Sequence, residues 1–259
     1  MSAMRWVSLE VHQGTAIVTL QNEPRRNAIT VELANELVSA CDAIDADRDV
    51  GVVVIKGSGG FFCSGGDRDE LAEICGDPSS SQSMDMTSRI YAAFLRFGEL
   101  EPPTIAAVRG GALGAGINLA LAADVRVVAR DAVISSGFTR LGVHPGGGHY
   151  GLLSQAAGPD AAAALGLLGQ SIDGTRAAEI GLAWEACADE DVEQRARALG
   201  VHAAQDPDLA RLAKASFSAE TGPPALPWKA AVQLERAPQI WSFARKGKSG
   251  WAQAERPTA

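Results

Sequence analysis

Twice in this chain, a run typical of a buried strand leads into a glycine-rich loop and then into a helix. The run "VGVVVIKG" (50–57) precedes "SGGFFCSGGD" (58–67), and "TIAAVRG" (104–110) precedes "GALGAGINLALAAD" (111–124). Continuous β-branched runs are typical of strands covered on both faces. Strand, loop and helix alternate over about two thirds of the chain, and the last third has helical patterning. The sequence therefore predicts an α/β core with a helical tail.

Local signals place further elements. The runs "WVSLEV" (6–11) and "TAIVTL" (15–20) predict a hairpin, and Thr30 is the expected N-cap of a helix with apolar residues at helical spacing. The polar stretch "GDPSSSQSMDM" (76–86) predicts a mobile surface loop, and "SRIYAAFLRFGEL" (88–100) predicts a helix after it.

The glycine-rich loops match neither nucleotide-binding motif. Residues 110–116 read Gly-Gly-Ala-Leu-Gly-Ala-Gly, the wrong order for the dinucleotide fingerprint, and no P-loop pattern is present. Either the glycines let a helix pack closely on a strand, or they leave backbone N–H groups uncovered at a helix start. The shared design of the two loops favours the second interpretation. Two such amides converging on one carbonyl oxygen form an oxyanion hole.

Charge and cysteine usage exclude several classes of partner. The formal net charge of −8 and the lack of a basic stripe argue against nucleic acid. No run reaches the ~18 apolar residues that cross a bilayer, and the N-terminus has no apolar signal core. The four cysteines lack metal-site spacing. We expect a cytoplasmic protein with reduced thiols, no metal and no membrane association.

Five segments, which include the two glycine-rich loops, occur in a recognisable order along the chain. They are "NEPRRNAIT", "GSGGFFCSGGDRDEL", "PTIAAVRGGALGAGINLALAADVRVVA", "RLGVHPGGG" and "GQSIDGTRAAEIGLAWEA". This series resembles the enoyl-CoA hydratase/isomerase (crotonase) superfamily. The resemblance implies a spiral of ββα repeats over residues 1–195 and a C-terminal helical trimerisation region over residues 196–259. It also implies assembly as a homotrimer or a dimer of trimers.

The resemblance implies an acyl-CoA thioester as ligand, with coenzyme A carried as part of the substrate and no other cofactor. By position, the backbone amides of Gly66 and Ala115 would hold the thioester oxygen, which fits the charge that an enolate places there. The resemblance further implies that the backbone near Ala28 and Ser64 receives the adenine. It implies that Arg25 or Arg26 lies near the CoA phosphates, with Arg68 at the rim of the pocket, and that Asp67 fixes the geometry of the loop.

The two glutamates used by hydratases of this family are missing. Their positions carry Asn118 and Phe138, and neither side chain exchanges a proton at neutral pH. The windows 116–120 and 135–142 contain no acidic residue, so a small alignment shift does not restore one. His144 and His149 flank the turn "HPGGGH" and titrate near neutrality. We consider His144 first as a relocated acid or base; otherwise each histidine packs or caps the next helix.

Two functions stay open from the sequence. The first is a crotonase-type enzyme, a lyase or isomerase by family, with altered chemistry of the isomerase or hydrolase type or with weak hydratase activity. The second is a non-catalytic acyl-CoA-binding protein that keeps the oxyanion pocket. Because fold resemblance does not fix chemistry, the residues of the site must decide between them.

Overall fold

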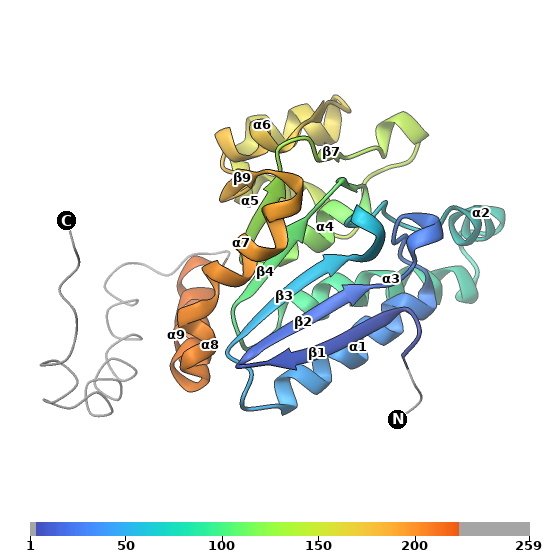
Figure 1. The fold of residues 1–259 in the computed structure, drawn as a ribbon. Helices are drawn as coiled ribbons and strands as arrows, with labels where there is room; N and C mark the ends of the chain where they lie inside the picture. The colour runs from blue at the N-terminus through green and yellow to red at the C-terminus, as the bar shows by residue number, and fades with distance from the viewer. Residues whose placement is uncertain (1–3, 223–259) are drawn as a thin grey trace, which may run out of the picture.

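The computed structural model describes residues 4–222, which form a mixed α/β fold (Figure 1). A six-stranded sheet has the order β1-β2-β3-β4-β6-β9. The first pair is antiparallel and forms the predicted hairpin, while each later neighbour pairs in parallel. The strands are β1 (Val7–His12), β2 (Thr15–Leu20), β3 (Val52–Gly57), β4 (Thr104–Val108), β6 (Val125–Ala129) and β9 (Glu185–Cys187).

A second sheet of three short strands carries the second glycine-rich loop. It consists of β5 (Gly111–Leu113), β7 (Val133–Ser135) and β8 (Ser171–Ile172), with β7 in the middle. β5 and β7 run in parallel, with Leu113 paired to Ser135. This pairing brings the residues that follow each strand to the same end of the sheet.

Helices surround the large sheet. In Figure 1, α1 and α3 lie beside the β1–β2 end, and α7 crosses in front of β4. The helices are α1 (Val31–Ala46), α2 (Arg68–Gly76), α3 (Ser81–Gly98), α4 (Ala115–Ala122), α5 (His149–Ala162), α6 (Gly174–Glu179), α7 (Val192–Leu199), α8 (Val201–Gln205) and α9 (Pro207–Thr221).

Two local predictions have different outcomes. Thr30 caps α1 as expected, because its side chain accepts from the amide of Leu33 at 3.1 Å. The predicted loop over 76–86 is wrong in its second half, because α3 begins at Ser81. The Ser80 side chain accepts from the amide of Ser83 and starts the helix there. Serine favours turns and helix N-caps equally well, so polarity alone did not separate the two.

The core lies between the large sheet and its helices. Only Lys56 of β3 is partly exposed, as the β-branched run over 50–57 predicted, and β4 is buried along its whole length. Phe94 and Phe97 bring α3 into this core, and Ile117 does the same for α4. The helix that follows the second glycine-rich loop is therefore held rigidly against the sheet.

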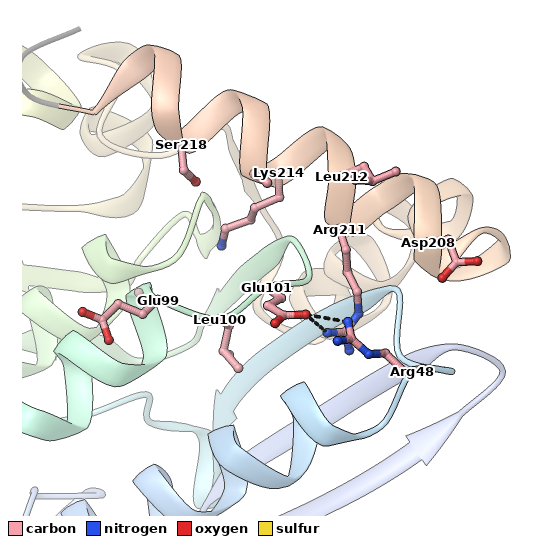
Figure 2. Close-up of a pocket in the computed structure, with 11 residues that line it drawn as sticks. Arg48, Glu99, Leu100, Glu101, Asp208, Arg211, Leu212, Lys214 and Ser218 are labelled. Carbon is pink, nitrogen blue, oxygen red and sulfur yellow. Dashed lines mark hydrogen bonds and ion pairs between the residues drawn. The ribbon is translucent and has the colours of Figure 1, made fainter. Parts of the chain in front are cut away.

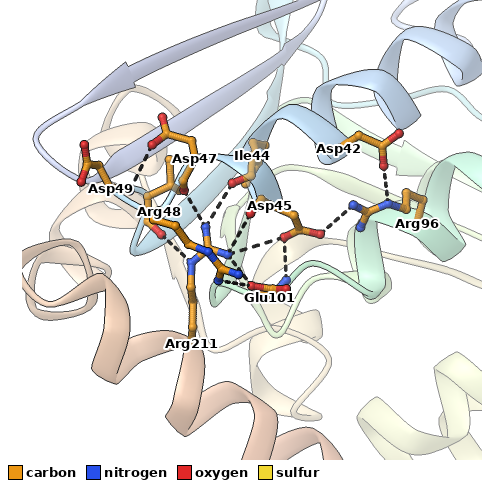
Figure 3. Close-up of polar contacts among 10 residues, drawn as sticks. Asp42, Ile44, Asp45, Asp47, Arg48, Asp49, Arg96, Glu101 and Arg211 are labelled. Atoms are coloured by element: carbon orange, nitrogen blue, oxygen red, sulfur yellow. Dashed lines mark hydrogen bonds and ion pairs between the residues drawn. The ribbon is translucent and has the colours of Figure 1, made fainter.

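α9 is joined to the core through two buried cations, Arg211 and Lys214, and Figure 3 shows the contacts of Arg211. The guanidinium of Arg211 donates to the carbonyl oxygens of Ile44 (3.1 Å), Asp47 (2.8 Å) and Val50 (3.2 Å), which lie at and just beyond the C-terminus of α1. Lys214 pairs with Asp124 at 2.7 Å. A cation at a helix C-terminus satisfies carbonyls that have no helical partner.

The described residues end within the predicted helical region. α8 and α9 cover its first part, and residues 223–259, with the basic run "RKGK" (245–248), lie outside the described residues. Within 4–222, no helix combines the length and apolar character that a bilayer crossing needs. The division at residue 195 and the oligomeric state stay predictions.

Candidate functional site

The two glycine-rich loops lie side by side. The amide of Phe62 donates to Arg109 O at 2.8 Å, and the amide of Cys63 donates to Gly111 O at 3.2 Å. In return, the amide of Leu113 donates to Cys63 O at 3.0 Å. Segments some 50 residues apart in the sequence therefore form one continuous backbone ladder, and the ends of both loops meet.

Glycine is required where the loops approach each other most closely. A Cβ at Gly65, whose φ is +95°, would stand 2.7 Å from Leu113 O and 3.4 Å from Ala115 N. A Cβ at Gly116 would stand 2.4 Å from Cys63 O. The close-packing interpretation of the glycines therefore holds at these two positions. It does not exclude the amide interpretation, because the same approach brings Gly66 and Ala115 into one region.

Neither of these two amides is used by the fold. The bridge between Ile29 and Gly66 is made by Ile29 N with Gly65 O (2.7 Å) and by Asp67 N with Ile29 O (3.0 Å), which omits the Gly66 amide. Ala115 is the first residue of α4, where an N–H has no helical acceptor. Across residues 4–222, neither amide donates a hydrogen bond. Both can therefore bind a ligand oxygen.

Asp67 is held by Arg25 rather than facing a ligand. Asp67 caps α2 by accepting from the amides of Asp69 and Glu70, and it pairs with Arg25 at 2.5 Å. Burial by itself raises the pKa of this carboxyl, but the bonds from Arg25 and the two amides outweigh it, so the pKa of Asp67 is lowered. Arg25 also pairs with Asp69 at 2.9 Å. Arg25 is thus largely committed to the loop.

The remaining basic residues of this region face solvent. Arg26 is exposed, adopts a φ of +50° and lies with its guanidinium 5.5 Å from the ring centroid of Phe61. Arg68 is exposed at the start of α2. Among the described residues, neither Arg26 nor Arg68 has a carboxylate partner. They are the free cations beside the first loop.

Ser64 and Ala28 lie next to these cations. The Ser64 hydroxyl donates to Arg25 O at 2.9 Å, and the Ser64 amide donates to Arg26 O at 3.0 Å. Ala28 is buried, and its carbonyl accepts from the side chain of Asn22 at 3.0 Å. Ser64 is only partly buried, whereas the Ala28 carbonyl already has a protein donor.

The two positions that lack acids meet at His149, which joins α5 to α4. His149 Nδ1 lies 2.7 Å from Asn118 Oδ1, and the Phe138 ring packs edge-on at 5.0 Å between centroids. Ser136 Oγ lies 2.7 Å from His149 Nε2. Ser136, Asn118 and His149 are each at most 1% exposed. Sequence reasoning did not identify Ser136, since "ISSG" shows only a strand ending in a turn.

Burial keeps His149 neutral. Desolvation lowers the pKa of His149 to about 4, so the imidazole has one N–H and one free acceptor nitrogen at neutral pH. His144 lies elsewhere: it is exposed, its Nδ1 is 2.6 Å from Pro145 O, and its ring lies 6.1 Å from that of Tyr150. The structure therefore brings His149, and not His144, into contact with Asn118 and Phe138.

A cavity lined by other residues lies outside these loops. It has a volume of about 820 Å³ and is lined by α9 and the end of α3, including Glu99, Arg211 and Lys214 (Figure 2). In its lining, Glu101 pairs with Arg211 at 2.7 Å and with Arg48 at 2.8 Å, whereas Lys214 pairs with Asp124 outside the lining. It contains none of the loop residues, so its size does not make it the reactive site. Within 4–222, no cluster of three His, Cys, Asp or Glu side chains is placed to hold a metal.

Comparison with known proteins identifies relatives of this chain. The enoyl-CoA hydratase/isomerase family model matches residues 10–252. A Mycobacterium tuberculosis protein named as a probable enoyl-CoA hydratase is 37% identical over 239 residues, covering 91% of each chain. The 1,2-epoxyphenylacetyl-CoA isomerase of Escherichia coli is 30% identical and covers 84% of each chain. The crystal structure of an enoyl-CoA hydratase from Bacillus anthracis superposes with a TM-score of 0.83 at 27% identity, covering 94% of this chain and 92% of that one.

Proposed function

From the premise that this chain belongs to the enoyl-CoA hydratase/isomerase family, we propose that it binds an acyl-CoA thioester and acts on it as an enzyme. The observation that carries the proposal is the pair of unused amides at Gly66 and Ala115, on loops that touch. Two such donors would stabilise negative charge on the thioester oxygen. Coenzyme A enters as part of the substrate, with no other cofactor.

The chemistry would differ from efficient hydration. A hydratase must orient a water and move a proton to Cα, and positioned acids or bases contribute about 10²–10⁴-fold each. Asn118 has no proton to exchange, and its amide donates to Gly146 O at 2.9 Å. Phe138 is apolar. We therefore expect weak or no hydration of crotonyl-CoA, and chemistry of the isomerase or hydrolase type.

Arg26 and Arg68 are the proposed contacts for the CoA phosphates, with Ser64 nearby for the adenine. Both arginines are exposed and have no carboxylate partner within residues 4–222, whereas Arg25 is paired with Asp67 and Asp69. Charge reversal at Arg26 (Arg26→Glu) would weaken CoA binding more than Arg25→Gln, measured by calorimetry. We further propose a cytoplasmic homotrimer or dimer of trimers, which sedimentation equilibrium tests.

The second candidate is a non-catalytic acyl-CoA-binding protein. The replacement of both acids by Asn118 and Phe138 favours it. Incubation with enoyl-, hydroxyacyl- and β-ketoacyl-CoA thioesters, followed by mass spectrometry, separates the two. Conversion of any thioester supports the enzyme, binding without conversion supports the alternative, and turnover of crotonyl-CoA at ordinary hydratase rates contradicts the altered chemistry.

The oxyanion role has a direct test at Ala115. Ala115→Pro removes this N–H at the first position of α4, where proline is tolerated, and Gly114 before it has no Cβ for the ring to meet. We expect conversion to fall about 10²–10³-fold. Ala115→Ser keeps the amide and is the matched control. A proline variant that stays folded, as thermal unfolding reports, and converts thioesters at the wild-type rate would contradict the role.

A further inference from the structure

We propose that Ser136, His149 and Asn118 form a nucleophile, base and positioning group that hydrolyses acyl-CoA thioesters. The inference rests on the proposed function, because it needs an acyl-CoA held by the two loops. It assigns a reaction class to the site and gives a role to Ser136. Three arguments carry it: the direction of the hydrogen bonds, the place of Ser136 beside the Ala115 amide, and the chemistry of a thioester.

The direction of the hydrogen bonds follows from Asn118. Its Nδ2 donates to Gly146 O at 2.9 Å, which turns its Oδ1 toward His149. An amide oxygen only accepts, so His149 Nδ1 carries the proton in the 2.7 Å contact. His149 Nε2 is then a bare acceptor, and Ser136 Oγ–H donates to it at 2.7 Å. This is the tautomer in which an imidazole can take the proton of a serine nucleophile.

The place of Ser136 is set by the small sheet. Leu113 of β5 pairs in parallel with Ser135 of β7, and the amide of Gly114 donates to Ser135 O at 3.0 Å. The pairing ends at these residues, but Ser136 stays close to Gly114, because a Cβ at Gly114 would stand 3.6 Å from Ser136 O. The amide after Gly114 is that of Ala115. A carbonyl oxygen bound at this amide places its carbon near Ser136.

Gly114 leaves open space beside the backbone of Ser136, whose side chain is itself buried and is uncovered only when the acyl group enters. A Cβ at Gly114 would have only Ser136 O at 3.6 Å and Phe138 Cζ at 3.9 Å within contact range. An acyl group can use the space that a side chain would have occupied. Phe138 is only partly buried, and its ring packs edge-on against the imidazole of His149. It therefore covers the hydrogen-bonded series Ser136–His149–Asn118, here called the relay, through an apolar contact.

The reaction is balanced with water as the second substrate. Ser136 Oγ bonds to the thioester carbon, its proton passes to His149 Nε2, and the C–S bond breaks. The proton then leaves with the CoA sulfur, giving CoA thiol and an acyl ester on Ser136. Water, deprotonated by His149, attacks this ester. The ester C–O bond breaks, the proton returns to Ser136, and the carboxylic acid departs.

A thioester suits a weak base of this kind. The His149 imidazole is a poor proton acceptor in its buried site, and Asn118 supplies no charge to stabilise an imidazolium. A thiol leaves as an anion far more readily than an alcohol or amine does, since thiol pKa values lie near about 8.5. We therefore expect slow turnover, with the acylation step observable in a single turnover.

The experiment uses the full chain with acetyl-, butyryl- and benzoyl-CoA, which hydrolyse but cannot be hydrated. Intact-protein and peptide mass spectrometry follow the acyl adduct, chromatography follows CoA release, and calorimetry follows binding. Ser136→Ala removes the nucleophile. Ser135→Ala is the matched control, because Ser135 is an adjacent buried serine whose hydroxyl bonds to Ser171 at 2.8 Å, outside the relay.

We expect an acyl group on Ser136 and CoA release that Ser136→Ala reduces at least 100-fold while thioester binding stays within threefold. Ser135→Ala should release CoA like the wild type. Binding without CoA release, or equal release by Ser136→Ala, overturns this inference and leaves the proposed acyl-CoA function standing. The absence of thioester binding by the wild type overturns both.

Discussion

Arg211 stabilises the docking of α9, and replacing it by methionine tests the origin of that stability. Its guanidinium is 7% exposed and donates to the carbonyls of Ile44, Asp47 and Val50 and to Glu101. Arg211→Met keeps much of the side-chain volume but removes the guanidinium donors. The carbonyls of Ile44 and Asp47 keep a backbone donor each, from the amides of Asp47 (3.2 Å) and Val50 (3.3 Å), whereas the Val50 carbonyl loses its bond from Arg211. Losing one partner of a buried charged network costs about 3–5 kcal/mol.

Water compensates for part of this loss of stability in Arg211→Met. Glu101 is about half-exposed, so water replaces its share of the interaction, and we expect the loss to lie near the lower end, at about 3 kcal/mol. Arg211→Lys should lose less, because an ammonium reaches some of the carbonyls but lacks the fork of a guanidinium. Urea unfolding followed by circular dichroism measures the change as a lower midpoint.

Arg48 provides the control. It contacts the same Glu101 oxygen at 2.8 Å, but its side chain is 69% exposed. An exposed pair contributes about 0–1 kcal/mol, so Arg48→Met should change the free energy of unfolding by less than that. If Arg211→Met were no more destabilising than Arg48→Met, the capping of the α1 carbonyls would not be what holds α9.

The remaining predictions concern a histidine, two glycines and the thiols. The pKa of His149 falls from about 6.5 in the unfolded chain to about 4 in the folded protein. The free energy of unfolding should therefore be highest above pH 6.5 and decline by up to about 3 kcal/mol as the pH falls toward 4. His149→Gln should remove this decline, as urea unfolding at a series of pH values would measure. Gly116→Ala should cost about 1–3 kcal/mol because its Cβ would meet Cys63 O, whereas Gly151→Ala, with open space around it in α5, should be neutral or slightly stabilising in the same assay. Iodoacetamide should modify one thiol of the native protein, at exposed Cys75, since burial raises the pKa of Cys41 and Cys63 to about 12 and Cys187 is also buried; rapid labelling at any other cysteine by peptide mass spectrometry would contradict this.

Local patterns in the sequence determined the strands, the α/β class and the two glycine-rich loops. β-branched runs identify buried strands because side-chain shape and burial act within a few residues, and Thr30 identifies the start of α1 for the same reason. The family resemblance of the sequence also predicts that Asn118 and Phe138 stand where a hydratase has acids. That prediction used the positions of the two residues relative to Gly114 and Gly146.

Tertiary structure alone decided which side chains meet Asn118 and Phe138. Ser136 and Asn118 lie 13 and 31 residues from His149, and they meet only after β7, α4 and α5 pack together. Arg211 likewise reaches the carbonyls of α1 across more than 160 residues. Side-chain hydrogen bonds between distant segments depend on how whole elements are placed, and no local periodicity records that placement.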